Sequence, residues 1–142
     1  MSWNAYVDSL KMPDEKGIVA VEEAALCGIL PGKEGVWASS EGLASITEDE
    51  IKKLAGDRKD FGQCGPCIAG VKCRMIRDSM DDETLHSLDL KTASDNEGNT
   101  YNICVGKSES VLIIAKGTKE ANGGQISSKV TTIVKYLRDK KM

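Results

Sequence analysis

The densest group of chemically reactive side chains in this 142-residue sequence is the motif Cys64-Gly65-Pro66-Cys67. Its spacing is that of a thioredoxin-type dithiol, in which a buried strand leads to the first cysteine and a helix begins there. Here residues 57–63 are polar, and the residues after Cys67 alternate as in a strand. The pattern therefore favours a turn with Gly-Pro at its tip. A thiol-redox module that uses Cys64 and Cys67 is kept as the alternative function.

Zinc binding is the second chemistry that these residues suggest. Cys64, Cys67, Cys73 and His86 could form a Cys₃His set, but structural zinc sites usually combine two close-spaced pairs, and the second pair is missing. Cys73 also falls on the apolar face of a predicted strand, where cysteine commonly acts as a small hydrophobic residue. We therefore predict no metal site and no cofactor.

Hydrolytic catalysis is poorly supported because the sequence has one histidine, His86, beside the acidic turn Asp81-Asp82-Glu83. A Ser or Cys nucleophile needs a positioned base, and no other histidine offers one. Gly123-Gly124 is not followed by the Lys-Ser/Thr of a phosphate-binding loop and is better placed to open a helix. The sequence predicts a protein that is not an enzyme.

The overall composition predicts a single domain, residues 1–142, with an ordinary 40% of hydrophobic and 29% of charged residues. The net charge of −3 argues against nucleic acid as a partner. We find no run of 18 apolar residues and no signal peptide. Five cysteines, an odd number, then indicate reduced thiols and a cytoplasmic protein. Residues 116–142 carry seven basic and two acidic side chains, a charge balance that could favour an acidic partner or lipid surface.

Three helices are predicted from apolar spacing and caps. The first spans residues 3–10, after Ser2 as a candidate N-cap. Thr47 and Glu50 spell a capping box for the second helix, which Gly56 ends. The third spans about 123–140 and is long and amphipathic.

Strands are predicted between these helices from apolar runs and turn residues. They cover residues 18–30, 36–40, 67–77, 85–92, 100–106 and 111–116. Over 67–77, Ala69, Val71, Cys73 and Met75 fall on one face. Short turns between successive strands imply antiparallel pairing, so the sequence predicts an α+β fold with helices packed on the sheet.

The aromatic residues suggest a binding function. Only 4% of the residues are aromatic, so the core must be aliphatic. Trp3 and Tyr6 lie on the first helix, Tyr136 on the last and Trp37 on an early strand. If the terminal helices lie side by side, these rings form a platform for a polyproline II ligand. Their indole N–H and hydroxyl groups can donate to the carbonyls of such a ligand. Ordinary core packing is the alternative explanation.

Several segments in the same order make the sequence similar to the profilin family, of the animal type. The segments are Ser2-Trp3-Asn4-Ala5-Tyr6-Val7-Asp8, Val36-Trp37-Ala38-Ser39, residues 70–79, Asp89-Leu90-Lys91-Thr92, Asn122-Gly123-Gly124 and Tyr136-Leu137-Arg138. The resemblance implies a central antiparallel sheet with the N- and C-terminal helices on one face and short helices on the other. It implies binding of monomeric actin and of proline-rich actin regulators such as formins, and a location in the cytoplasm and cytoskeleton. It also implies binding of phosphoinositides such as phosphatidylinositol bisphosphate.

The resemblance also assigns residues to these functions. The polyproline site would comprise Trp3, Tyr6, Trp37, Tyr136 and Leu137. The actin-binding face would comprise Phe61, Lys72, Arg74, Met75, Arg77, Lys91, Ala121, Asn122, Gly124, Ser128 and Lys129. Departures from common animal patterns are Tyr136 and Asn122 in place of His, Ser128 in place of Lys, and Met142 in place of Tyr. By charge alone, lipid contacts would fall on Lys116, Lys129, Arg138, Lys140 or Lys141.

Overall fold

The computed structural model of the chain describes residues 3–13, 16–30, 32, 34–56, 65–82 and 85–142. In chain order the elements are α1 (Trp3–Lys11), β1 (Val21–Gly28), β2 (Gly35–Ser39), the 3₁₀ helix η1 (Glu41–Leu43), α2 (Glu48–Ala55), β3 (Cys67–Ile68), β4 (Val71–Ser79), β5 (Ser87–Thr92), β6 (Asn102–Lys107), β7 (Val111–Gly117) and α3 (Gly123–Asp139). No helix within these ranges is long and apolar enough to cross a membrane.

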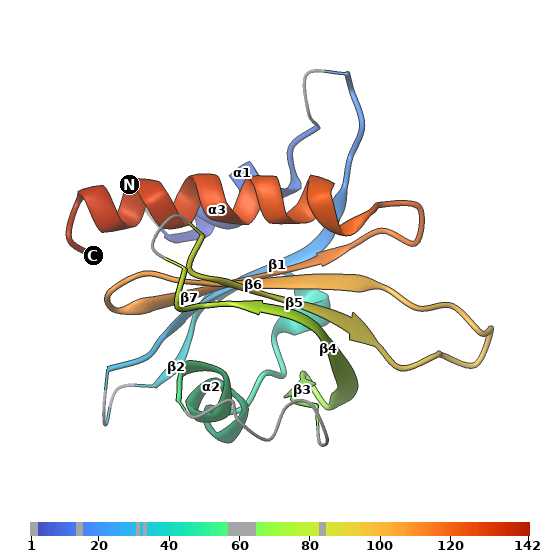
Figure 1. Cartoon of the computed structure of the whole chain (residues 1–142), viewed down its shortest axis with the longest axis horizontal. Helices are drawn as coiled ribbons and strands as arrows, with labels where there is room; N and C mark the ends of the chain where they lie inside the picture. The colour runs from blue at the N-terminus through green and yellow to red at the C-terminus, as the bar shows by residue number, and fades with distance from the viewer. Residues whose placement is uncertain (1–2, 14–15, 31, 33, 57–64, 83–84) are drawn as a thin grey trace.

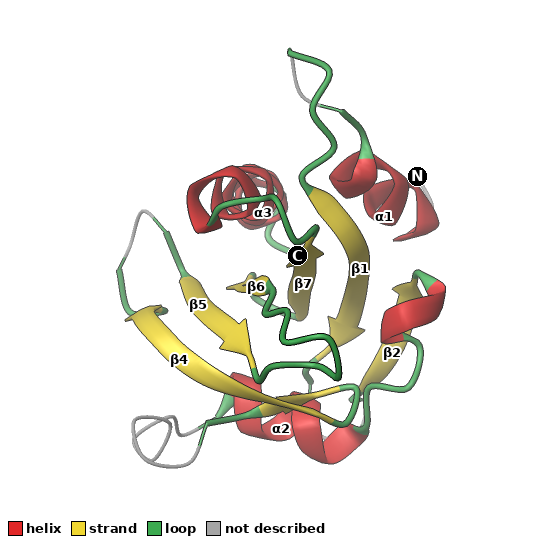
Figure 2. Ribbon diagram, turned by 90° about the vertical axis from the view of Figure 1, so that its right-hand side faces the viewer, coloured by secondary structure: helices red, strands yellow, loops and turns green. Residues whose placement is uncertain are grey.

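The strands form one seven-stranded sheet in the order β2-β1-β7-β6-β5-β4-β3. Every neighbouring pair is antiparallel, as the short connections predicted. Helices α1 and α3 lie side by side on one face of the sheet, and α2 lies on the other (Figures 1 and 2). The predicted α+β arrangement, with terminal helices on one face and short helices on the other, is confirmed.

The sheet separates two hydrophobic clusters, and its interior strand β7 contributes side chains to both. Val111, Ile113 and Ala115 point into the cluster under α1 and α3. Leu112 and Ile114, which alternate with them, point into the cluster under α2. A strand that is buried on both faces reads as a continuous apolar run, which is the pattern Val-Leu-Ile-Ile-Ala of this segment. The core is aliphatic, as the scarcity of aromatic residues predicted.

Two capping boxes fix where α2 and α3 begin. The Thr47 hydroxyl accepts from the amide of Glu50, whose carboxylate accepts from the amide of Thr47, as the sequence predicted. Asn122 and Gln125 form the same reciprocal pair at α3. The sequence spells this second box as Asn-x-x-Gln, a signal in addition to the two glycines from which the helix start was predicted. The candidate cap Ser2 of the first helix lies outside the described residues.

The prediction of one strand over residues 67–77 is wrong. Two strands, β3 and β4, are joined there by a tight turn in which Ala69 and Gly70 have φ values of 53° and 81°. Two successive positive φ values suit a hairpin whose loop consists of two residues, here Ala69 and Gly70. The Glu50 carboxylate stabilises this turn, since it accepts from the amides of Ala69 and Gly70 at 3.0 Å. Val71 is consequently exposed, while Cys73 remains buried.

Candidate functional site

Four aromatic side chains from three elements form a continuous row on the surface of the α1/α3 side. The Trp37 and Trp3 rings have centroids 5.0 Å apart, and the Trp3 and Tyr6 rings are 5.4 Å apart. Tyr6 and Tyr136 follow at 6.3 Å. We call this row, Trp37–Trp3–Tyr6–Tyr136, the ring row. The terminal helices are adjacent, and the four rings lie together as the sequence predicted for that case.

The packing of α1 and α3 explains how the ring row forms. Val7 and Leu10 anchor α1 in the core, and Trp3 and Tyr6 pack partly against the same cluster. Burial raises the pKa of Tyr6, and the neighbouring Tyr136 raises it further. Tyr6 therefore keeps its hydroxyl proton near neutral pH, where the group can donate a hydrogen bond.

Leu137 does not belong to the surface on which it was expected. Its side chain is completely buried in the cluster under α3, whereas Tyr136 is 45% exposed. Consecutive residues on an α-helix point about 100° apart. With Leu137 directed into the core, Tyr136 is directed toward the ring row, so the role of Leu137 is to orient the helix.

A second surface lies on the part of the sheet beside the start of α3. In the strand register, Arg74 pairs with Lys91, and Arg77 pairs with Asp89. Cross-strand partners share a face, and the Arg77 guanidinium lies 3.0 Å from the Asp89 carboxylate. Asn102, the β6 partner of Lys91, donates from its amide to the carbonyl of Ala121. The sheet register thus brings Arg74, Arg77 and Lys91 to the side where α3 begins.

A hollow of about 410 Å³ joins these strands to α3. Arg77, Asp89 and Asn102 line it from the sheet, and Gly124 lines it from the helix. Asn122, Gly124 and Ser128 are exposed nearby on the first turns of α3, while Ala121 is buried. Lys129 donates from its ammonium group to the carbonyl of Met12.

One predicted member of the actin-binding face lies on the other side of the sheet. Met75 packs against the cluster under α2, which is the opposite side of the sheet, because it alternates with Arg74 along β4. Phe61 lies outside the described residues.

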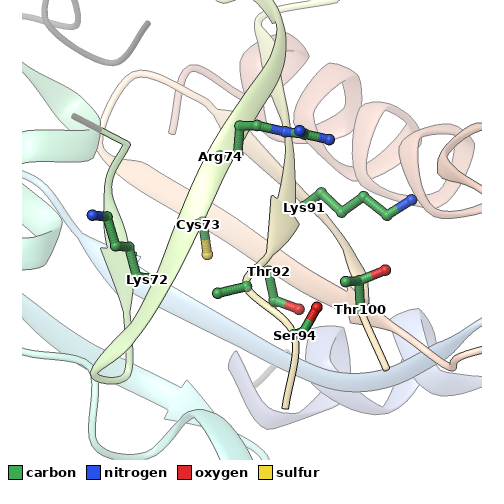
Figure 3. A pocket seen from close by; sticks show the side chains of 8 residues that line it. Lys72, Cys73, Arg74, Lys91, Thr92, Ser94 and Thr100 are labelled. Atoms are coloured by element: carbon green, nitrogen blue, oxygen red, sulfur yellow. The ribbon is translucent and has the colours of Figure 1, made fainter. Parts of the chain in front are cut away.

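A basic pocket of about 440 Å³ borders the same surface. Three cationic side chains, from Lys72, Arg74 and Lys91, line it. The hydroxyl groups of Thr92, Ser94 and Thr100 line it as well, and they are residues that sequence reasoning missed. Figure 3 shows Arg74 and Lys91 extending in the same direction from neighbouring strands, with Lys72 on the other side of β4. Cations and hydroxyl donors together can bind an anion.

Several of the lysine and arginine residues that charge alone assigned to lipid make contacts within the protein. Lys116 lies over the Tyr101 ring at 4.4 Å, and Lys140 lies 5.7 Å from the centre of the Tyr136 ring. Arg138 donates twice to the carbonyl of Lys107. Lys116 on β7, Arg138 on α3 and Lys140 at the end of α3 thus each contact a different group.

The cysteine motif does not have the surroundings of a redox site in the part that the structure describes. Cys67 is exposed and begins a strand, where a thioredoxin-type dithiol would have a helix. Cys73 is buried, and burial raises its pKa to about 12, so the thiol stays protonated. Among the described residues, no group of three or more His, Cys, Asp or Glu side chains could hold a metal ion. Cys64 lies outside those residues.

Comparison with known proteins places these surfaces in context. A family model described as Profilin matches residues 1–142. Rat profilin-2 is 36% identical over 140 residues, which cover 96% of each chain. Human profilin-1 is 34% identical over 139 residues, covering 96% of this chain and 95% of the relative.

A solved structure gives the corresponding result for the fold. Mouse profilin IIa, in complex with a double repeat from the FH1 domain of mDia1, superposes with a TM-score of 0.88. The alignment covers 100% of both chains at 34% identity.

Proposed function

This chain belongs to the profilin family, and from that premise we propose that it binds monomeric actin and proline-rich segments of actin regulators on separate surfaces. It would thereby regulate actin filament assembly in the cytoplasm and cytoskeleton without being an enzyme. The observation that carries the proposal is the ring row, because four aromatic side chains lie together outside the core. The mouse relative, which is bound to a formin FH1 repeat, supports the same partner class.

The ring row suits an extended proline-rich ligand for physical reasons. A polyproline II helix is already extended before binding, so it loses little conformational entropy. Its pyrrolidine rings can pack against the faces of Trp3, Tyr6 and Trp37. Indole N–H and tyrosine hydroxyl groups can donate to its carbonyls, which have no partner within the helix.

For the actin-binding face we propose the surface formed by β4, β5 and the start of α3. Arg74, Arg77 and Lys91 supply positive charge there. Asn122, Gly124, Ser128 and Lys129 continue the surface onto α3. Positive charge at such a surface increases the association rate with an acidic partner and makes the rate sensitive to salt. We leave Leu137 and Met75 out of the proposed sites because both side chains point into the core clusters.

Binding both partners at once would deliver actin to a growing filament end. A proline-rich elongation factor held by the ring row and an actin monomer held by the sheet would be joined through this protein. Such a bridge raises the local concentration of actin without any new contact between the partners.

Retention on poly-proline resin tests the proposal directly. We expect the native protein to bind and Trp3→Ala to lose at least about thirtyfold in affinity, since Trp3 contacts two neighbouring rings. Tyr101→Ala is the matched control, because that ring lies under Lys116 and bonds to Asp95, outside the ring row. A native protein that passes through unretained would show that the ring row does not bind proline-rich ligands.

Phosphoinositide binding is a second candidate function, favoured by the basic pocket. Arg74 and Lys91, which extend in the same direction, together with the hydroxyl groups of Ser94 and Thr100, suit a phosphorylated headgroup. We expect flotation with liposomes that contain phosphatidylinositol bisphosphate and not with neutral liposomes. Lys91→Gln should weaken this association. The control is Lys135→Gln, because Lys135 is an exposed lysine on α3, outside the pocket. Equal flotation with both kinds of liposome would contradict the assignment.

A further inference from the structure

The pairing of β1 with β2 contains an irregularity at one residue of the ring row. Leu26 pairs with Ala38, but the next residue, Cys27, pairs with Val36. Trp37 is therefore the extra residue of a β-bulge, with no partner on β1. Bulges change the direction of a side chain relative to a regular ladder. The bulge accounts for a Trp37 side chain that points toward α1 although its strand is at the edge of the sheet.

The Trp37 indole then lies against the backbone of Gly28, at the end of β1. A Cβ atom at residue 28 would come within 2.6 Å of the indole Cε2, Cζ2 and Nε1 atoms. Real Cβ contacts are longer than this, so any side chain at position 28 must displace the ring. The absence of a side chain is what allows the indole its present position.

We propose that Gly28 is a positioning residue for the proline-binding site. It provides a flat surface that holds the Trp37 indole beside Trp3, with ring centroids 5.0 Å apart. The assignment rests on the proposed function, and it concerns a residue that the ligand itself does not touch, because Gly28 is buried.

This arrangement has a thermodynamic consequence. Trp37 is 39% exposed, and an exposed indole on an edge strand would otherwise sample several rotamers. Contact with Gly28 on one side and Trp3 on another restricts the ring before the ligand arrives. Less conformational entropy is then lost on binding, which increases affinity without an added contact.

The test is the affinity of Gly28→Ala for decaproline, measured by calorimetry. We expect at least a tenfold increase in Kd, because the added methyl group displaces the indole from Trp3. Gly35→Ala is the matched control: Gly35 pairs with Gly28 across the ladder, yet a Cβ there would meet nothing within 4 Å. This control should bind within twofold of the native protein.

A second measurement separates positioning from general loss of structure. The chain has two tryptophans, so its NMR spectrum shows two indole N–H signals, which Trp37→Phe assigns. Gly28→Ala should shift the Trp37 signal in the absence of ligand. In a Trp37→Ala background, adding Gly28→Ala should leave the unfolding free energy unchanged. The remaining affinity for decaproline should stay within twofold of that of Trp37→Ala alone.

The outcomes distinguish this assignment from the proposed function. Native-like binding by Gly28→Ala, or an additional loss in the Trp37→Ala background, would overturn the positioning role alone. Failure of the unsubstituted protein to bind decaproline would overturn the proposed function and the positioning role together.

Discussion

The two proposed binding surfaces are constructed in different ways. The ring row combines α1, β2 and α3, and its members contact one another directly, with ring centroids 5.0–6.3 Å apart. The actin-binding face depends on strand register, which places charged side chains of β4 and β5 side by side. In the first surface, side chains hold each other in place. In the second, the backbone ladder holds each side chain independently.

This difference determines how each surface should respond to substitution. Rings that support each other lose several contacts when one is removed or displaced, so single changes should have large effects. Charges spaced along strands act nearly independently, and each exposed charge contributes modestly. The three substitutions disturb first the helix that both surfaces share, then a support on the α2 side of the sheet, and then a single charge.

Gly106→Ala should have the largest effect. A Cβ at residue 106 would lie 2.4 Å from Val134 Cγ2 and 2.6 Å from Val130 Cγ1, so it pushes α3 away from the sheet. We expect a loss of about 3 kcal/mol in unfolding free energy, near the upper end for overpacking. Chemical denaturation measures it.

The same variant also tests the comparison. Val134, which meets the added Cβ most closely, lies two residues before Tyr136, so proline affinity should fall more than actin affinity in the folded protein. Equal losses at both surfaces would show that the ring row is no more interdependent than the actin-binding face.

Glu50→Ala should cost about 2 kcal/mol of unfolding free energy. The carboxylate accepts from the amides of Thr47, Ala69 and Gly70, and its removal leaves the Thr47 amide and the hairpin turn without their acceptor. Affinity for proline-rich peptide should not change. The exposed neighbour Asp49, substituted by alanine, is the control for helix charge, and stability equal to that control would contradict this role.

Arg77→Glu should have the smallest effect, about a tenfold loss of actin affinity, or about 1.4 kcal/mol. The new carboxylate would face Asp89, now 3.0 Å from the guanidinium, and would repel an acidic partner. Pull-down at two salt concentrations should show a weaker salt dependence than the native protein has. Arg77→Gln, which removes charge without reversing it, should lose less. Unchanged actin binding by Arg77→Glu would remove β4 from the proposed face.

Local sequence signals predicted much of this structure. The helix ends at Thr47 and Gly56 and the antiparallel pairing follow from neighbouring residues alone. The hairpin turn at Ala69 was not predictable in this way, because an alanine rarely takes a positive φ and the carboxylate that stabilises the turn belongs to α2. The turn depends on a contact that local reasoning does not include.

The candidate sites likewise include parts that local sequence signals predict and parts that they do not. The ring row could be expected because its residue types are unusual and the helices carrying them were evident. The bulge at Trp37 left no sign in the sequence, since one extra residue in a strand looks like ordinary alternation. The basic pocket could not be read from the sequence, because Arg74 and Lys91 come together only through the pairing of β4 with β5.

The contact between Tyr6 and Tyr136 has a consequence for protein synthesis. These two rings lie near opposite ends of the sequence, so a chain emerging from the ribosome carries Trp3 and Tyr6 long before Tyr136 exists. Helix α3 also covers the cluster that anchors α1. A nascent chain that extends only as far as β7 therefore has no complete ring row, and the ring row forms only after α3 has been made.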